Sequence, residues 1–193
     1  MIVTLSGASG AGKSTIGEWL RKHFGVNLKP VVSYTTREPR DADPSGEYAY
    51  VSSEEFERMK ANKEFLWSVF VHGIHFGTTL RSFEETKREP DAIFLMILEP
   101  DSVGTLHIHA KRMGLKIVPF YILPPSISEL RRRLEKRGDT AGVIEKRIDD
   151  CLKWDAQALT SGIPYTFVRN DLDDTGRLAA TIITREISER MVP

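Results

Sequence analysis

Short apolar runs alternate with segments of helical periodicity along most of the chain. The runs are nearly continuous, which is typical of parallel strands covered on both faces, and they lie at residues 1–5, 92–98, 116–123 and 165–168. Apolar residues at helical spacing predict helices at residues 14–24, 101–113, 126–137, 143–159 and 173–190. Pro119 is awkward for a central strand, because proline has no N–H to donate. Strands that alternate with helices predict an α/β fold with three layers around a parallel sheet.

The segment from about residue 30 to residue 81 breaks this alternation. It contains basic and aromatic residues, a polar turn at residues 41–46 and a predicted helix at residues 53–62, with short strand candidates around it. Ser52 and Glu55 have the spacing of a capping box, which marks the start of that helix. We interpret the segment as an insertion of mixed short strands and one helix.

Composition limits the possible partners. The 193 residues contain 27 Lys and Arg and 27 Asp and Glu, so the net charge of zero offers no general attraction to nucleic acid or to an anionic membrane. Cys151 is the single cysteine, which excludes a disulfide framework and favours a packed thiol in a reducing compartment. No apolar run approaches the length of a membrane span, and the first strand begins at residue 2. We expect a cytoplasmic protein without a targeting segment, either a monomer or a homodimer.

A glycine-rich turn joins the first strand to the first helix. Its sequence fits the pattern G-x-x-x-x-G-K-[ST] of loops that bind nucleoside triphosphates, and its residues are Gly7, Ala8, Ser9, Gly10, Ala11, Gly12, Lys13, Ser14 and Thr15. Glycines allow backbone N–H groups to surround a phosphate chain at the start of the helix. Lys13 is expected to reach the β- and γ-phosphates, and the Ser14 hydroxyl is expected to bind Mg²⁺.

A second basic loop follows at residues 33–40. Arg37 and Arg40 lie three residues apart beside Pro39, so they could present two guanidinium groups to one phosphate, and Tyr48 could add a hydroxyl. A solvated basic loop is the alternative interpretation. A phosphoryl acceptor would need such a second phosphate clamp, which makes phosphoryl transfer the favoured function.

The sequence resembles the guanylate kinase family over nearly its whole length. The resemblance is carried by residues 7–15, by residues 33–40 with Gly46, Tyr48 and residues 51–52, by Phe65, Gly73, Phe76, Gly77 and Thr78, by residues 124–126, by Leu134, Arg137, Gly138 and Arg147, and by residues 170–172. It implies a P-loop kinase fold with a core at residues 1–32, 83–125 and 156–193. It also implies an inserted acceptor-binding domain at residues 33–82 and a helical lid at residues 126–155.

The resemblance also implies roles for single residues. Arg37, Arg40 and Tyr48 would hold the phosphate of the acceptor. Lys13, Arg137 and Arg147 would be catalytic, because phosphoryl transfer depends on cations that converge on the transferring group. Arg133 would lie near the adenine of ATP, and Asn170 would help to recognise that adenine. A lid would keep water from competing with the acceptor.

The sequence departs from the family around the acceptor base and the metal. Trp67 stands where the family usually has a guanine-reading glutamate, and Phe76 replaces a family tyrosine that touches the acceptor phosphate, so one hydroxyl donor is missing. Ser33 and Thr78 keep hydroxyl groups. Only Glu99 remains of the family's paired aspartates, with Ile97 at the other position. Glu99 could therefore read the guanine donors or support Mg²⁺, or the pocket could no longer be one for guanine.

We expect ATP-dependent phosphoryl transfer to a nucleoside monophosphate, either GMP or dGMP. A modified or non-guanine nucleotide, or a sugar phosphate such as ribose 1,5-bisphosphate, is an alternative acceptor. A non-catalytic guanylate-kinase-like binding module is a less favoured alternative, because the phosphate loop and the lid arginines are all present. A regulatory GTPase would need an Asn-Lys-x-Asp motif, which the sequence lacks.

Overall fold

The fold is built around a five-stranded parallel sheet, seen in a computed structural model that describes residues 1–40, 43, 45–71, 73–124, 126–170 and 176–191. Its strands lie in the order β2 (Leu28–Pro30), β7 (Ile93–Ile97), β1 (Ile2–Ser6), β8 (Ile117–Leu123) and β9 (Thr166–Arg169). Ile2 of β1 pairs with Phe94 on one side and with Ile117 on the other. Pro119 lies inside β8 and pairs with Thr4, so this proline does not break the strand.

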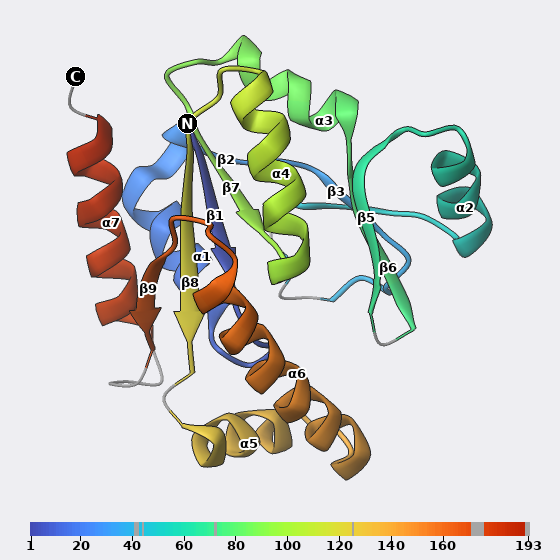
Figure 1. Cartoon of the computed structure of the whole chain (residues 1–193), viewed down its shortest axis with the longest axis vertical. Coiled ribbons are helices and arrows are strands. Elements are labelled where there is room, and N and C mark those ends of the chain that lie inside the picture. The colour runs from blue at the N-terminus through green and yellow to red at the C-terminus, as the bar shows by residue number, and fades with distance from the viewer. Residues whose placement is uncertain (41–42, 44, 72, 125, 171–175, 192–193) are drawn as a thin grey trace.

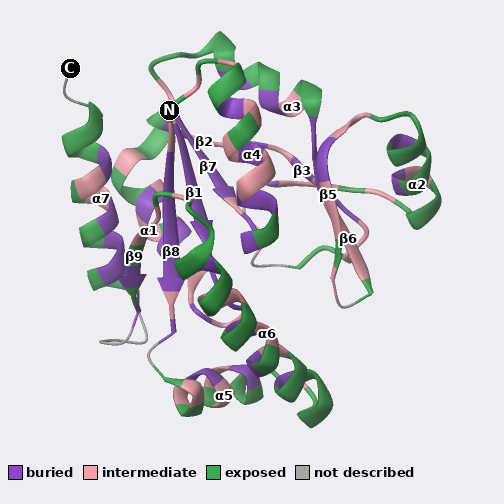
Figure 2. Cartoon of the chain, in the orientation of Figure 1, coloured by how far each residue is buried: buried purple, intermediate pink, exposed green. Residues whose placement is uncertain are grey.

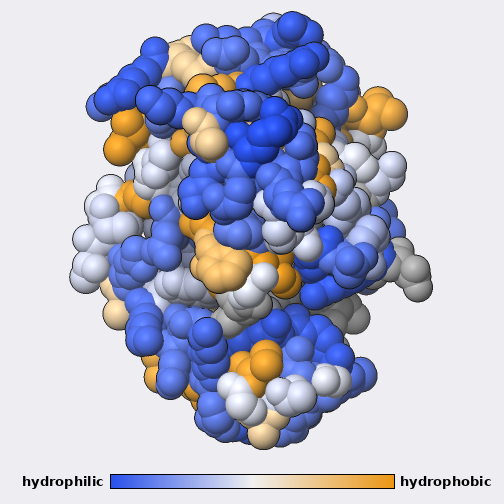
Figure 3. Space-filling view, turned by 90° about the vertical axis from the view of Figure 1, so that its right-hand side faces the viewer, coloured by the Kyte–Doolittle hydropathy of each residue, from blue (hydrophilic) through white to orange (hydrophobic). Residues whose placement is uncertain are grey.

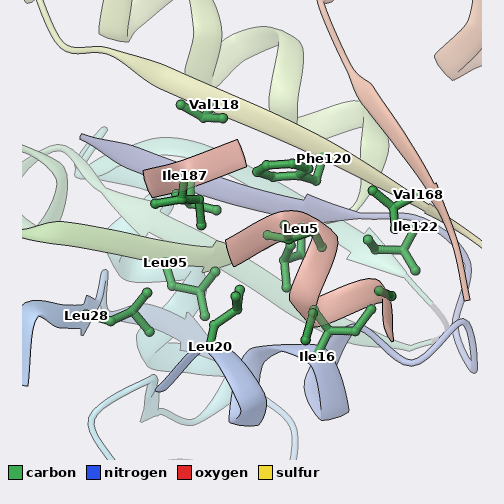
Figure 4. Close-up of a cluster of buried hydrophobic side chains, with 14 of the residues drawn as sticks. Leu5, Ile16, Leu20, Leu28, Leu95, Val118, Phe120, Ile122, Val168 and Ile187 are labelled. Atoms are coloured by element: carbon green, nitrogen blue, oxygen red, sulfur yellow. The ribbon is translucent and has the colours of Figure 1, made fainter. Parts of the chain in front are cut away.

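Helices cover both faces of the buried sheet (Figures 1 and 2), and alternating side chains of its strands build two separate cores. Val3 and Leu5 point to the face covered by α1 (Lys13–Phe24) and α7 (Arg177–Met191), where they pack with Leu20 and Ile187 (Figure 4). Ile2 points to the other face, into a core that includes Val103 and Leu106 of α4 (Pro100–Arg112). The expected three-layer α/β fold is therefore confirmed. The predicted start of the last helix, at residue 173, lies outside the described residues.

A second, smaller sheet lies beside the first, and the basic loop at residues 33–40 begins in one of its strands. Its strand order is β4 (Tyr48–Tyr50), β3 (Ser33–Thr35), β6 (Ile74–Thr79) and β5 (Phe65–Val71), with α2 (Ser53–Ala61) between β4 and β5 in the chain. β3 pairs in parallel with β4 and antiparallel with β6, so the sheet is mixed, and the segment holds the short strands and the helix that were expected. α3 (Leu80–Glu84) and the short 3₁₀ helix η2 (Glu85–Arg88) lead back to β7, and another 3₁₀ helix, η1 (Gly25–Asn27), precedes β2.

Two helices lie across the carboxyl end of β8, as Figure 1 shows for α5 (Ile127–Lys136) and α6 (Ala141–Thr160). Leu130 and Leu134 of α5 pack with Ala8 of the phosphate loop, and Cys151 of α6 is buried in the same cluster. Cys151 is thus a packed free thiol, as predicted. None of the helices in the described part of the chain has the length and apolarity that a membrane crossing requires.

Candidate active site

Three glycines give the loop after β1 its shape. Gly7, Gly10 and Gly12 have φ angles of 131°, 89° and 98°, a region that residues with a Cβ rarely adopt. A Cβ at Gly7 would lie 2.3 Å from the carbonyl oxygen of Ile122, and a Cβ at Gly12 would lie 2.2 Å from Nδ2 of Asn170. Glycine is required at these positions both by the backbone angle and by the close approach of neighbouring atoms.

Lys13 lies across the inside of this loop. Its Nζ donates hydrogen bonds to the carbonyl oxygens of Gly7, at 2.6 Å, and Ala8, at 2.9 Å. Burial lowers the pKa of Lys13, while the nearby carboxylate of Glu99 partly opposes this effect. Ser14 is exposed at the first turn of α1, where its hydroxyl can face a ligand. The loop therefore presents a cation and a hydroxyl at the amino end of a helix, which suits bound phosphates.

Asn170 ties the loop to the end of β9. Its side-chain Nδ2 donates a hydrogen bond of 2.8 Å to the carbonyl oxygen of Ala11, and only 4% of the residue is exposed. Arg133 of α5 reaches the same place, with Nη2 at 3.4 Å from the Asn170 carbonyl oxygen. A cavity of about 450 Å³ lies in front of these residues and is lined by Gly12, Lys13, Thr15, Arg133 and Asn170 among others. The residues expected to bind ATP are therefore brought together.

Arg137 and Arg147, which were expected to belong to a lid, meet on one carboxylate. Asp139 accepts hydrogen bonds from Arg137, with 2.5 Å between Nη2 and Oδ2, and from Nη1 of Arg147 at 2.5 Å. Arg137 also lies 3.4 Å from the Ser9 hydroxyl of the phosphate loop. Nε of Arg147 is buried and has no partner among the described residues. Arg137 thus reaches the phosphate loop, and both arginines line a cavity that Ser9 and Ser14 also line.

On the acceptor side, Arg37 and Arg40 do not share one anion in this structure. Arg37 donates to both carboxylate oxygens of Asp43, at 2.8 and 2.9 Å, and its guanidinium carbon lies 5.3 Å from the ring centre of Tyr48. Arg40 is exposed, and only its backbone N–H reaches Asp43, at 2.8 Å. The carboxylate of Asp43 thus accepts the hydrogen bonds that the Arg37 guanidinium could donate to a phosphate. Burial and the neighbouring Glu47 raise the pKa of Tyr48, so its hydroxyl stays protonated as a donor.

Of the residues predicted to bind the acceptor, all except Thr78 line a second cavity of about 190 Å³. The hydroxyls of Ser33 and Thr78 lie 3.2 Å apart in a buried hydrogen bond, at the edge where β3 and β6 meet. Trp67 and Phe76 contribute aromatic rings to the wall. Only 8% of Trp67 is exposed, and its Nε1 has no hydrogen-bond partner among the described residues. Figure 3 shows this side of the molecule, with a hydrophilic surface interrupted by hydrophobic side chains near its middle.

Glu99 follows β7 and precedes α4, at the carboxyl edge of the parallel sheet. Burial raises the pKa of its carboxyl group, while the charge of Lys13 partly opposes this effect. Its Oε2 is buried and has no partner among the described residues. No group of three or more metal-binding side chains occurs among the described residues. Mg²⁺ in kinases is held by one or two protein groups and by substrate phosphates, so Ser14 with Glu99 fits this requirement.

Two carboxylates of the site were not predicted from the sequence. Asp43 lies in the polar turn that was recognised only as a turn, part of which falls outside the described residues. Asp139 follows Arg137 by two residues. The structure identifies both carboxylates through their ion pairs with the predicted arginines. Their closeness in the sequence to those arginines was the signal that could have identified them.

The comparisons with known proteins identify the family of this chain. The family model described as guanylate kinase matches residues 1–186. The chain belongs to the guanylate kinase family. It is 34% identical to a guanylate kinase of Ruegeria pomeroyi over 99% of this chain and 88% of that protein. It is 37% identical to a guanylate kinase of Carboxydothermus hydrogenoformans over 96% of this chain and 88% of that protein.

The crystal structure of guanylate kinase from Anaplasma phagocytophilum has the same fold. It matches with a TM-score of 0.72 at 23% identity, over 100% of this chain and 87% of that one. The expectations of a P-loop kinase fold and of an enzyme of this family are confirmed.

Proposed function

We propose that the protein transfers the γ-phosphoryl group of ATP to GMP or dGMP, giving ADP and the nucleoside diphosphate. One observation carries the proposal beyond family membership. Side chains from the phosphate loop, the second sheet and the lid all line the same cavity, namely Ser9, Ser14, Arg37, Arg40, Arg137 and Arg147. A donor phosphate and an acceptor phosphate can therefore meet in one place surrounded by cations, which is the main requirement of phosphoryl transfer.

Each chain segment has a distinct task in this reaction. Lys13 and the loop N–H groups hold the β- and γ-phosphates of ATP. Arg37, Arg40 and Tyr48 bind the phosphate of the acceptor, which displaces Asp43 from Arg37. Arg137 and Arg147 neutralise negative charge on the transferring group, where a preorganised cation lowers the barrier most. Closure of residues 126–155 over the loop excludes water, which would otherwise accept the phosphoryl group.

Mg²⁺ is the metal that these residues would hold, through Ser14 and Glu99. When bound, it would neutralise charge on the phosphate oxygens of ATP. Asn170 and Arg133 border the donor cavity and would contact the adenine of ATP. Ser33, Trp67, Phe76, Thr78 and Glu99 would surround the base of the acceptor.

The test is acceptor-dependent release of ADP. Purified protein is incubated with Mg-ATP and, separately, with GMP, dGMP, AMP, IMP, CMP and UMP, and ADP is measured by a coupled assay. Activity with GMP or dGMP that disappears in Lys13→Ala supports the proposal. Lys22→Ala is the matched control, because Lys22 lies on the same helix near the ring of Trp19, away from the lining of both cavities. ADP release that does not depend on any acceptor would overturn the proposal.

A further inference from the structure

Helix α6 contributes a large aromatic side chain to the acceptor cavity. Trp154 lines this cavity together with Arg147 of the same helix. The two residues are seven positions apart, which is about two helical turns, so their side chains project from the same face of α6. That face is therefore directed at the space in which the donor and acceptor phosphates would meet.

Contacts on either side of Trp154 hold this part of α6 in place. Cys151 is buried in the cluster that α6 forms with α5 and the phosphate loop. Asp155 accepts a hydrogen bond of 2.7 Å from the hydroxyl of Tyr121, and Nε2 of Gln157 donates one of 2.7 Å to a carboxylate in the first turn of α4. The helix is thus anchored to the core at the position from which the indole projects.

The indole of Trp154 is not part of the hydrophobic core. Trp67 belongs to the buried cluster that includes residues of α4, and Trp19 packs against the cluster on the other face of the large sheet. Trp154, in contrast, is only half-buried and belongs to none of the three clusters that the described residues form. A large apolar surface that lines a cavity and is not used by the core is available to a ligand.

Apolar side chains of the second sheet line the same cavity. Val69 and Val71 come from β5, and Ile74 and Phe76 come from β6. The cavity is therefore bounded by apolar groups from two different elements, the second sheet and α6. A planar aromatic group that lies among them is removed from water on its flat faces. Of the parts of a nucleotide, only the base is such a group, because the phosphate requires the cations of the site.

Contact with the face of a base is compatible with recognition of its polar edge. Glu99 lines the same cavity, and its Oε2 is buried without a partner among the described residues. The charge of Asp150, one turn before Trp154 on α6, contributes to the raised pKa of Glu99, so this part of the helix lies close to Glu99. Stacking uses no hydrogen bond, so a base that lies against Trp154 keeps its N–H groups for such an acceptor.

We propose that Trp154 packs against the flat face of the acceptor base, which makes α6 part of the acceptor site. This inference rests on the proposed function, in which the acceptor is a nucleoside monophosphate. The same face of α6 then contacts the transferring phosphoryl group through Arg147 and the acceptor base through Trp154. A bound acceptor thereby holds α6 in the position in which Arg147 can act.

The test compares substitutions of Trp154 with the wild-type enzyme. Trp154→Ala should raise KM for GMP by about tenfold, which is typical of the loss of stacking between a base and an aromatic side chain. It should change kcat and KM for ATP by less than about threefold, because the contact is present both before and during transfer. Trp154→Phe keeps an aromatic ring and should stay within about threefold of the wild type in KM for GMP. Leu159→Ala is the matched control, because Leu159 is a large side chain of α6 that is 70% exposed and lies outside the lining of both cavities.

Ribose 5-phosphate distinguishes contact with the base from a general loosening of α6. It carries the sugar and the phosphate without the base, and its inhibition constant is measured in competition with GMP. This constant should agree within about threefold between the wild type and Trp154→Ala, since the cations that bind the phosphate are unchanged. Equal increases in this constant and in KM for GMP would show that the substitution only loosens the helix, and would overturn the proposal. Unchanged KM for GMP in a folded Trp154→Ala would overturn it as well.

A measurement on the wild-type protein does not depend on the folding of a variant. GMP should protect tryptophan fluorescence from quenching by acrylamide, whereas ribose 5-phosphate should not. Only 8% of Trp67 is exposed, and Trp19 lies on α1 outside the lining of this cavity, so the protection reports on Trp154. Absence of protection at saturating GMP would overturn the proposal.

These outcomes separate the inference from the function on which it rests. Absence of ADP release with every nucleoside monophosphate would contradict the proposed function and the inference with it. ADP release with GMP that does not change in Trp154→Ala would leave that function intact and refute only the inference.

Discussion

Removal of the Asn170 side chain should destabilise the protein even in the absence of nucleotide. The Nδ2 atom of this residue donates to the carbonyl oxygen of Ala11 in a buried position, 159 residues away in the sequence. In Asn170→Ala that oxygen loses its partner, at a cost of about 1–3 kcal/mol for a buried unsatisfied group. For a domain of this size, each kcal/mol corresponds to about 2–4 °C in Tm. The expected decrease in Tm is therefore about 2–12 °C.

The assay is thermal unfolding followed by circular dichroism without nucleotide, together with KM for ATP. Asn170→Asp keeps the shape but replaces the donor with an acceptor that faces the Ala11 oxygen, so it should be at least as destabilising as the alanine variant. Asn62→Ala is the control, because the amide of Asn62 makes only an exposed hydrogen bond to Glu64. It should change the free energy of unfolding by about 0.5 kcal/mol or less.

The same measurements separate two roles of Asn170. A residue that only recognises adenine would raise KM for ATP and leave the Tm of the nucleotide-free protein unchanged. A residue that holds the phosphate loop would lower that Tm and would raise KM as a consequence of the loosened loop. An unchanged Tm in both Asn170 variants would refute the reasoning from the hydrogen bond to Ala11.

Three further predictions follow from the cations of the site. Lys13→Ala should lower kcat by about 100-fold or more in a folded protein, and unchanged turnover would remove Lys13 from the mechanism. Arg40→Ala should raise KM for the acceptor far more than KM for ATP, whereas equal effects would place its loop elsewhere. Burial alone would raise the pKa of Asp43, but hydrogen bonds from Arg37, Tyr50 and the Arg40 N–H hold it below its usual value. The ionised carboxylate therefore stabilises the fold at pH values above its unfolded pKa. This contribution is lost as the pH falls through the folded pKa. The Tm difference between wild type and Asp43→Asn should therefore shrink from about pH 6 to about pH 3.

Much of the fold could be predicted because its strands and helices carry strong local patterns. The helix predicted at residues 143–159 spans Ala141–Thr160, and the one predicted at residues 53–62 spans Ser53–Ala61. The strand order could not be predicted in the same way. β2 contains only three residues, Leu28–Pro30, and its place at the edge of the sheet depends on pairing with β7, which is far away in the sequence.

The sequence predicts those parts of the candidate site whose residues are close together in the chain. The phosphate loop needs its glycines, Lys13 and Ser14 in one contiguous segment, so a single motif identifies it. Asp139 was missed because its function is to accept from Arg137 and Arg147 together, which becomes visible only when α5 and α6 pack. The hydrogen bond from Asn170 to Ala11 likewise depends on β9 lying next to β8, beside the loop.

The side chains around the acceptor cavity are less constrained by the backbone than the phosphate loop is, and the structure gives a physical reason. Phosphate binding uses backbone N–H groups and glycine angles, so few sequences can perform it without loss of the fold. The side chains that line the acceptor cavity, in contrast, project from strands whose backbone pairing does not depend on them. Trp67 pairs with Thr78 through its backbone, while its side chain belongs to the buried cluster that also contains Leu98 and Val103. A tryptophan at this position therefore supports the packing of β5 on α4 and at the same time lines the acceptor cavity.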